Sequence, residues 1–299
     1  MRRLPLALLA LLCVVLQPVH TQPRGLKVHI SVDMEGIAGV VTGDQLSPSG
    51  FEYGRFREFM TAEALAAVAA AKEAGATDIV VADSHGNGEN LLVERFPADV
   101  RIVRSWPRRL EMMAGIDQTF DAAIFIGYHA STTNPTGVRA HTFSSASLTK
   151  VTLNGVEMSE GAWNAAVAGH FNVPIVMVSG DDAAVAEIRK VVGPIEGVET
   201  KQTLGFHSAV TRTPEAVQAM IGPAVKAGLA RRGSLTPYTP QGPLVVDVTF
   251  KNYLPAEVLA YLPLFERSSA HSVRFRPKDM AEAAATIQFI TEYRVDLAP

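Results

Sequence analysis

One short stretch of the sequence most constrains the fold of this chain. Residues 28–32, VHISV, form a mostly apolar run that predicts a buried β-strand, and Asp33, Glu35 and Gly36 follow it directly. In an extended backbone, residues two apart point to the same side, so the two carboxylates lie together at the end of the strand. Such carboxylates repel each other unless a cation lies between them, and a metal ion is the commonest such cation. The stretch therefore predicts a strand end that binds metal.

The rest of the chain alternates between short apolar runs and longer amphipathic ones. Strands are expected at residues 27–33, 78–82, 100–105, 122–127 and 173–178, with an Asn-Gly hairpin at residues 148–158. Helices are expected between the strands, among them a long one at residues 59–74 and a short one at residues 90–96. This alternation predicts an α/β fold, with a mostly parallel sheet and helices on both faces. After residue 197 the pattern changes to a helix at 214–230, expected to break or kink at Pro223, and then to further short elements. We expect a metal-binding α/β domain at residues 22–197 and a smaller α+β domain at residues 198–299.

The N-terminus has the features of a secretory signal. Arg2 and Arg3 precede an apolar stretch at residues 4–16, which is too short to span a membrane as a stable helix. We predict that residues 1–21 are cleaved and that the protein is exported, either to a periplasm or out of the cell; an uncleaved anchor is the alternative. The single cysteine, Cys13, lies in this leader, where lipidation is the weaker alternative, so the mature chain has no disulfide.

Composition excludes several classes of partner. The chain has 299 residues, is 47% hydrophobic and 19% charged, and carries a formal charge of −3, which is typical of a globular protein with a sizeable core. It has no basic run, so we expect no nucleic-acid partner. Beyond the leader no stretch is long and apolar enough to cross a membrane, so no stable insertion is expected after cleavage.

Further metal-type residues follow two other predicted strands. His85 lies in the Asp-Ser-His sequence after the second strand, His129 follows the fourth, and Glu160 opens a later helix. Each residue alone could be an ordinary loop residue or a helix cap. The ends of parallel strands, however, meet at the same sheet edge, where ligands bind in α/β folds. A donor set of oxygen and imidazole without sulfur suits zinc, manganese or cobalt.

These motifs resemble a known enzyme family. The sequences SVDMEG around Asp33, DSH at His85, GYHA at His129 and EGAWN at Glu160 are similar to those of the DppA-type D-aminopeptidases, the M55 family of zinc metallopeptidases. The resemblance extends from about Lys27 to the closing helix. The motifs occur in the same order as in the family, which makes the resemblance specific.

The resemblance implies an activity and a set of roles. It implies an aminopeptidase that releases N-terminal D-amino acids from short peptides such as D-Ala-D-Ala, with two zinc ions per chain and a homodecameric ring. Asp33 would bridge both zinc ions, Glu35 and His85 would complete one site, and His129 and Glu160 the other. His141 corresponds to the proposed catalytic residue of the family. Its role as general base, nucleophile or oxyanion donor stays open, and Arg139 nearby would favour its neutral form.

Two other functions remain possible at this level. A metallopeptidase or amidase of the same scaffold could prefer L-peptides or another amide, with the same ligands. An exported protein could instead bind a peptide without cleaving it, but such a protein has no need of five metal-type ligands.

Overall fold

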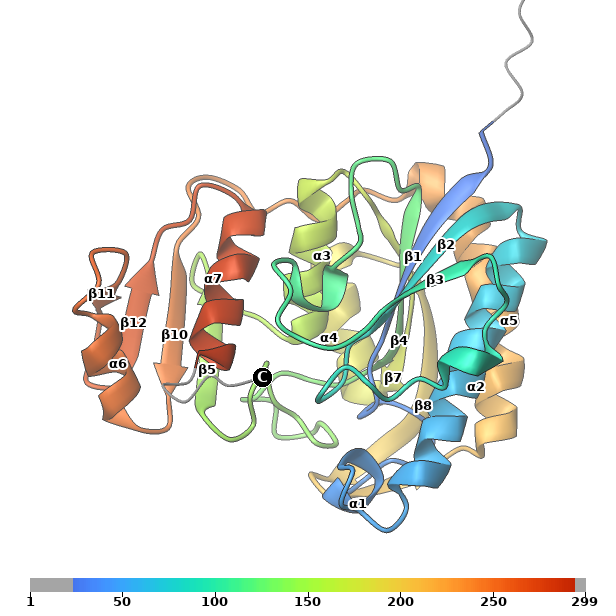
Figure 1. The fold of residues 1–299 in the computed structure, drawn as a ribbon, viewed down its shortest axis with the longest axis horizontal. Helices are drawn as coiled ribbons and strands as arrows, with labels where there is room; N and C mark the ends of the chain where they lie inside the picture. Colours follow the sequence, from blue (N-terminus) through green and yellow to red (C-terminus); the bar gives the residue numbers. More distant parts are fainter. Residues whose placement is uncertain (1–23, 294–299) are drawn as a thin grey trace, which may run out of the picture.

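The computed structural model of the protein describes residues 24–293 and arranges them in two β-sheets with helices around them (Figure 1). Within these residues the larger sheet has seven strands in the order β3-β2-β1-β4-β7-β8-β9, parallel throughout except for the pair β8 and β9. The smaller sheet is antiparallel, in the order β11-β12-β10-β5-β6. The predicted fold class is therefore confirmed.

The strands and helices have the following bounds. The larger sheet contains β1 Leu26–Val32, β2 Ala76–Asp83, β3 Val100–Val103, β4 Ala122–Tyr128, β7 Ile175–Asp181, β8 Glu196–Gly205 and β9 Ser208–Thr211. The smaller sheet contains β5 Leu148–Leu153, β6 Val156–Glu157, β10 Val246–Phe250, β11 Glu266–Arg267 and β12 Ser272–Phe275. The α-helices are α1 Gly43–Leu46, α2 Tyr53–Glu73, α3 Glu160–His170, α4 Asp182–Val192, α5 Pro214–Arg231, α6 Tyr253–Leu259 and α7 Met280–Glu292. Three short 3₁₀ helices are η1 Val93–Arg95, η2 Glu111–Met113 and η3 Arg232–Ser234.

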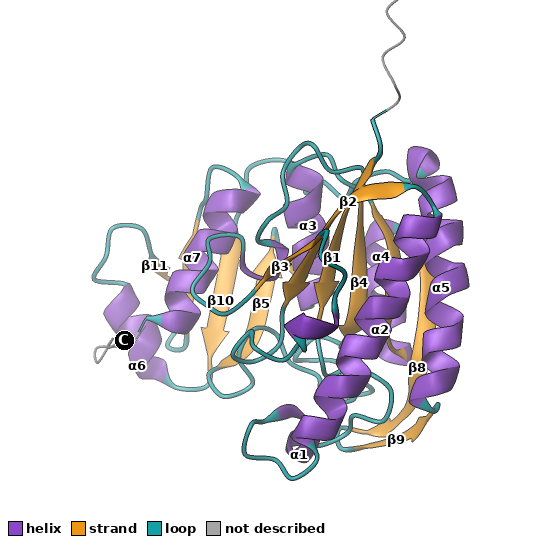
Figure 2. Ribbon diagram, turned by 45° about the vertical axis from the view of Figure 1, so that its right-hand side comes forward, coloured by secondary structure: helices purple, strands orange, loops and turns teal. Residues whose placement is uncertain are grey.

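Helices cover both faces of the larger sheet. Helices α2 and α5 lie side by side on one face (Figure 2), and α3 and α4 lie on the other (Figure 1). The strands between them are buried on both faces, which explains their continuous apolar runs. Helix α7 packs against α3, on the side where the smaller sheet lies.

The topology places the carboxyl ends of β1, β2 and β4 next to one another. The chain leaves β1 for β2 on one side and later returns to β4 on the other, which makes the end of β1 a topological switch point. Gly36 allows the loop after β1 to press against β4, because its N–H donates to the Gly127 carbonyl at 2.7 Å. A Cβ at Gly36 would lie only 2.1 Å from the Tyr128 carbonyl oxygen, so no other residue fits there.

Several local predictions were wrong in detail. Helix α2 begins at Tyr53, six residues before the predicted start at residue 59. The helix predicted at residues 90–96 is only the single turn η1, because the backbone N–H groups of Asn90 and Leu91 donate to the Asp83 carboxylate. Helix α5 continues unbroken through Pro223. The preceding Gly222 has no Cβ to meet the proline ring, which removes part of the usual clash.

Two predictions on organisation remain predictions. The leader at residues 1–21 lies outside the described residues. The domain boundary at residue 197 falls inside β8, a strand of the larger sheet, while β5 and β6 from the N-terminal part of the chain lie in the smaller sheet. None of the helices in residues 24–293 is long and apolar enough for a membrane span.

A buried histidine in β1 gives a prediction on how the free energy of unfolding depends on pH. His29 in β1 is fully buried, and its Nε2 lies 3.1 Å from the Ala114 carbonyl oxygen. Burial lowers the pKa of His29 to about 4. Between pH ~6.5 and pH 4 the unfolded chain therefore binds a proton at this histidine that the folded chain does not bind. We expect the wild-type free energy of unfolding to fall by about 3 kcal/mol more than that of His29→Gln between pH 7 and pH 4. Urea unfolding of both metal-free proteins measures this, and equal pH dependence would contradict it.

Candidate metal centre and active site

The residues that the sequence singles out converge at the switch point of the larger sheet. They come from five places in the chain: the loop after β1, the loop after β2, the end of β4, the loop before β5, and the first turn of α3. All are buried or nearly so, with side-chain exposures between 1% and 14%: Asp33, Glu35, His85, His129, His141 and Glu160. The structure therefore brings all six predicted site residues together.

Asp33 lies at the centre of this group. Its Oδ1 accepts the backbone N–H of Met34 at 2.8 Å and lies 3.5 Å from His85 Nδ1. Its Oδ2 lies 3.3 Å from His129 Nε2 and has no hydrogen-bond partner among the described residues. One carboxylate thus presents one oxygen to each histidine, which is the arrangement that a bridging ligand requires.

Each histidine is held by a backbone carbonyl that fixes the nitrogen left free. His85 Nε2 lies 2.9 Å from the Leu46 carbonyl oxygen, so its Nδ1 faces Glu35 Oε2 at 2.8 Å. His129 Nδ1 lies 3.0 Å from the Ala130 carbonyl oxygen, so its Nε2 faces Asp33 and Glu160. A carbonyl accepts only an N–H, so each ring keeps its other nitrogen for a ligand or a proton.

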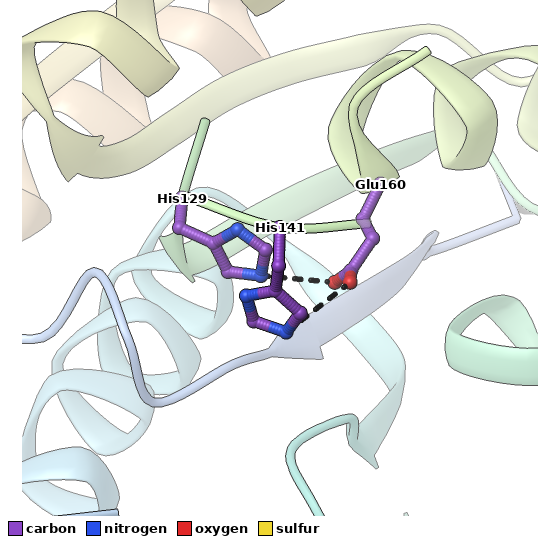
Figure 3. A group of neighbouring side chains, drawn as sticks. All are labelled: His129, His141 and Glu160. Carbon is purple, nitrogen blue, oxygen red and sulfur yellow. Dashed lines mark ion pairs between the residues drawn. The ribbon is translucent and has the colours of Figure 1, made fainter. Parts of the chain in front are cut away.

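Glu160 and His141 form the second half of the group (Figure 3). Glu160 Oε2 lies 3.2 Å from His129 Nε2, while its Oε1 accepts the backbone N–H of Phe143 at 2.6 Å and lies 3.8 Å from His141 Nε2. The rings of His129 and His141 stack with centroids 4.0 Å apart. His141 Nδ1 lies 2.8 Å from the Arg139 carbonyl oxygen, which leaves Nε2 as the free nitrogen.

The pKa values of the acids and histidines in the metal-free site are strongly shifted by burial and by one another. Burial raises the pKa of Asp33 to about 8, with the Glu35 charge adding to the rise. Burial acts in the opposite direction on His85 and His129, but the adjacent carboxylates outweigh it and raise the pKa of both imidazoles well above their usual range. The same pairing with His85 holds the pKa of Glu35 well below its ordinary value, although burial alone would raise it. In the metal-free protein the protonated imidazoles balance the carboxylate charge, which a bound metal ion would otherwise balance.

The pKa of His141 shifts the other way. Burial lowers it, and the neighbouring His129 lowers it further, so His141 is the neutral histidine of the group. From the sequence we expected the Arg139 cation to favour this neutral form; the lowering comes first from burial and then from His129. The Arg139 guanidinium lies 5.2 Å from the centroid of the Phe206 ring and 3.2 Å from His207 Nε2. The backbone carbonyl of Arg139 is the group that holds His141 Nδ1.

The donor set fits a metal ion. Ligand atoms of Asp33, Glu35 and His129 lie within 4.8 Å of one another, and so do those of His129, His141 and Glu160. The buried Asp33 Oδ2 and His129 Nε2 face each other without any hydrogen-bond partner in the described chain, which is costly unless a further group satisfies both. Imidazole nitrogens and carboxylate oxygens are ligands that zinc accepts, so the residues present fit this metal.

The group opens into a cavity of about 310 Å³. Asp33, Glu35, His85, His141 and Glu160 form one part of its wall. Ser84 and Gly86, on either side of His85, also line it. The other lining residues come from segments not expected from the sequence, namely the stretch from Trp106 to η2, the loop after His141, and helix α7: Trp106, Glu111, Met112, Phe143, Ser144, Ser145, Ala146, Gln288, Thr291 and Glu292. No motif marks these residues, because they come from separate parts of the chain that only the fold brings together.

Buried polar residues position the ligand loops. Lys201 in β8 is 1% exposed, and its Nζ donates to the carbonyl oxygens of Glu35, Ile37 and Val40 at 2.5–2.9 Å. This lysine fixes the loop that carries the two acids. Asp83 caps the turn after His85, because its carboxylate accepts hydrogen bonds from Asn90 and from the backbone N–H of Leu91.

Comparison with known proteins identifies the family. The model of the M55 peptidase family, described as D-aminopeptidase, matches residues 26–289. The chain belongs to the M55 peptidase family. A D-aminopeptidase of Bacillus subtilis (strain 168) is 31% identical over 268 residues, which cover 89% of this chain and 97% of the relative. The solved structure of a Zn-dependent D-aminopeptidase DppA from Bacillus subtilis, described as a self-compartmentalizing protease, superposes with a TM-score of 0.86 over 91% of this chain and 100% of its own.

Membership of the M55 family agrees with the resemblance inferred from the four motifs. The chain is accordingly a metallo-aminopeptidase, a hydrolase that acts on peptide bonds. The structural match covers both sheets, since it includes nine-tenths of the chain, so the smaller sheet is part of the family fold.

Proposed function

We propose that this protein is a zinc-dependent D-aminopeptidase that releases N-terminal D-amino acids from short peptides, with D-Ala-D-Ala among its substrates. The observation that carries the proposal is the Asp33 carboxylate, which presents one oxygen to the His85 and Glu35 side and the other to the His129 and Glu160 side. We propose two zinc ions per chain, with Asp33 shared between them. Bound zinc supplies a Lewis acid for the peptide carbonyl and lowers the pKa of a nearby water.

The chain's own residues supply the proton transfer. The His141 Nδ1–H donates to the Arg139 carbonyl, so the Nε2 of the neutral ring can accept a proton but cannot donate one to an oxyanion. Of the three roles open from the sequence, this geometry favours general base or nucleophile. The His129 ring stacks on the imidazole, and the Phe143 backbone N–H holds the Glu160 carboxylate beside it, at the wall of the cavity.

The substrate preference and the metal requirement are tested together. We expect the mature protein, residues 22–299, to hydrolyse D-Ala-D-Ala and to lose at least about 100-fold of its activity with 1,10-phenanthroline, with recovery on adding zinc. The isomer 1,7-phenanthroline, which cannot chelate, is the control and is expected to have no effect. Faster turnover of L-Ala-L-Ala would replace the D-specific proposal with the L-peptidase alternative. Binding without turnover of either peptide would favour the peptide-binding alternative.

We further propose that the protein assembles into a homo-oligomer, a decamer by resemblance. Its support is a group of exposed apolar side chains on α6 and in the segment after it, because such groups mark interaction surfaces when they are contiguous. The side chains there are between 45% and 76% exposed: Tyr253, Leu254, Val258, Tyr261, Leu262 and Leu264. We expect light scattering to give about ten times the mass of one mature chain. A monomer at micromolar concentration would contradict the assembly without affecting the proposed chemistry.

A further inference from the structure

One acidic residue in the cavity has no part in the proposed zinc chemistry. Glu111, the first residue of η2, lines the same cavity as the metal-type ligands but belongs to neither group of candidate ligands. Its side chain is 4% exposed. A carboxylate this deeply buried is costly unless it is paired, so its position calls for a partner.

The structure fixes where Glu111 points. Its Oε2 accepts the indole N–H of Trp163 at 3.1 Å, and Trp163 is itself fully buried with the Phe143 ring against its edge. Its backbone has a φ of 50°, in the left-handed region that non-glycine residues seldom adopt. The other carboxylate oxygen, Oε1, has no hydrogen-bond partner among residues 24–293. One carboxylate oxygen is thus held by Trp163, and the other is available to a ligand in the cavity.

The cation that acts on Glu111 is committed elsewhere. The positive charge of Arg108 lowers the pKa of Glu111, but its guanidinium stacks on Trp106, 3.7 Å from the ring centroid, and donates to the Asp83 carbonyl. Among the described residues no ion pair includes Glu111. Burial therefore raises the pKa of Glu111 well above its usual range, and the carboxylates of Glu160 and Glu292 add to the rise. A positively charged ligand in the cavity would supply the missing partner.

We propose that Glu111 binds the α-ammonium group of the substrate peptide. This inference rests on the proposed aminopeptidase function and names how the free N-terminus is recognised. In any peptide the α-nitrogen lies roughly 2.5 Å from the carbonyl carbon of the same residue, so its binding group must adjoin the site of cleavage. Glu111 meets this condition, because the Trp163 that anchors it lies one helical turn after Glu160 on α3.

This assignment links recognition of the free amino group to a preference for one configuration at the first Cα of the substrate. With the α-ammonium on Glu111 and the carbonyl at the metal-type ligands, two of the substituents on the first Cα are fixed. The configuration at that carbon then decides where its side chain points. Glu111 would thus act as a binding residue that orients the first amino acid.

Binding of a matched pair of ligands tests the inference. D-Ala-D-Ala and N-propionyl-D-alanine differ only in the amino group. We expect Glu111→Gln to weaken D-Ala-D-Ala binding about 10- to 100-fold, the range for a hydrogen bond to a charged group, and to change N-propionyl-D-alanine binding less than about twofold. Calorimetry on zinc-loaded protein with a His141→Ala background, in which turnover is slowed, measures both affinities. Glutamine keeps an oxygen for the Trp163 N–H, and unchanged propionyl binding reports an intact cavity.

Glu292→Gln is the matched control, since Glu292 lines the same cavity but is exposed on α7. It removes the same charge and is expected to change neither affinity more than about threefold. Equal weakening of D-Ala-D-Ala binding by both variants would overturn the assignment. So would a Glu111→Gln protein that still prefers D-Ala-D-Ala over N-propionyl-D-alanine as strongly as its parent does, since the amine would then be bound elsewhere. Failure of the wild-type enzyme to hydrolyse D-Ala-D-Ala would instead refute the proposed function and leave this binding comparison valid.

Discussion

Replacing Asp33 with asparagine is expected to remove both metal ions and to lower kcat/KM by at least about 10³-fold. The physical reason is that each Asp33 oxygen faces a different histidine, so one substitution removes a charged ligand from both positions. Metal ions contribute several kcal/mol to such reactions, and each 1.36 kcal/mol is a tenfold change in rate. Elemental analysis after gel filtration measures the metal content, and D-Ala-D-Ala hydrolysis measures the rate.

Two comparisons make the Asp33 result specific. Glu35→Gln alters only the His85 side of the group, so it is expected to lose mainly one metal ion. Asp182→Asn, at a half-buried aspartate that accepts hydrogen bonds from Thr203, is expected to keep both. Equal, mild loss from Asp33→Asn and Glu35→Gln would refute the bridging role.

Stability measurements distinguish the loss of a metal-binding side chain in Asp33→Asn from damage to the fold. Burial holds the pKa of Asp33 at about 8 in the metal-free protein, so its ionised form is unfavourable in the folded state at neutral pH. Metal-free Asp33→Asn is therefore expected to be at least as stable as the metal-free wild type. Zinc should raise the melting temperature of the wild type and leave that of the variant unchanged, because a ligand stabilises only the protein that binds it.

Replacing His141 with alanine is expected to lower kcat roughly 10²- to 10⁴-fold while the metal content stays at the wild-type value. His141 is the neutral histidine of the group, with Nε2 free, so its loss removes a proton acceptor or nucleophile at the cavity wall. KM for D-Ala-D-Ala should change only a few-fold. Single-turnover kinetics and elemental analysis on the same preparation measure these quantities.

The closest alternative role for His141 is metal binding, because its nitrogen lies within 4.8 Å of ligand atoms of His129 and Glu160. Loss of one metal ion from His141→Ala would show that His141 is a ligand and would contradict the catalytic assignment. His141→Gln tests the oxyanion role, since an amide can donate a hydrogen bond. Equal loss from the alanine and glutamine variants would exclude donation to the oxyanion.

Helix α2 and η1 show why the sequence predicted element types better than element ends. Apolar runs and alanine-rich stretches are local properties, so β1, β4 and most of α2 could be predicted from them. The end of an element depends on which distant group takes its free N–H donors. The turn after β2 ends as it does because the Asp83 carboxylate accepts two N–H groups seven and eight residues later.

The sequence by itself determined the candidate metal ligands, because each follows a recognisable strand or opens a helix, and parallel strand ends must meet at one sheet edge. The motifs also determined the family. Only the tertiary structure decided which nitrogen each histidine leaves free and that His141 is neutral, since both depend on backbone carbonyls and on burial. It alone placed Glu111 in the cavity, because that placement depends on an indole N–H from a helix about 50 residues away and on no local pattern.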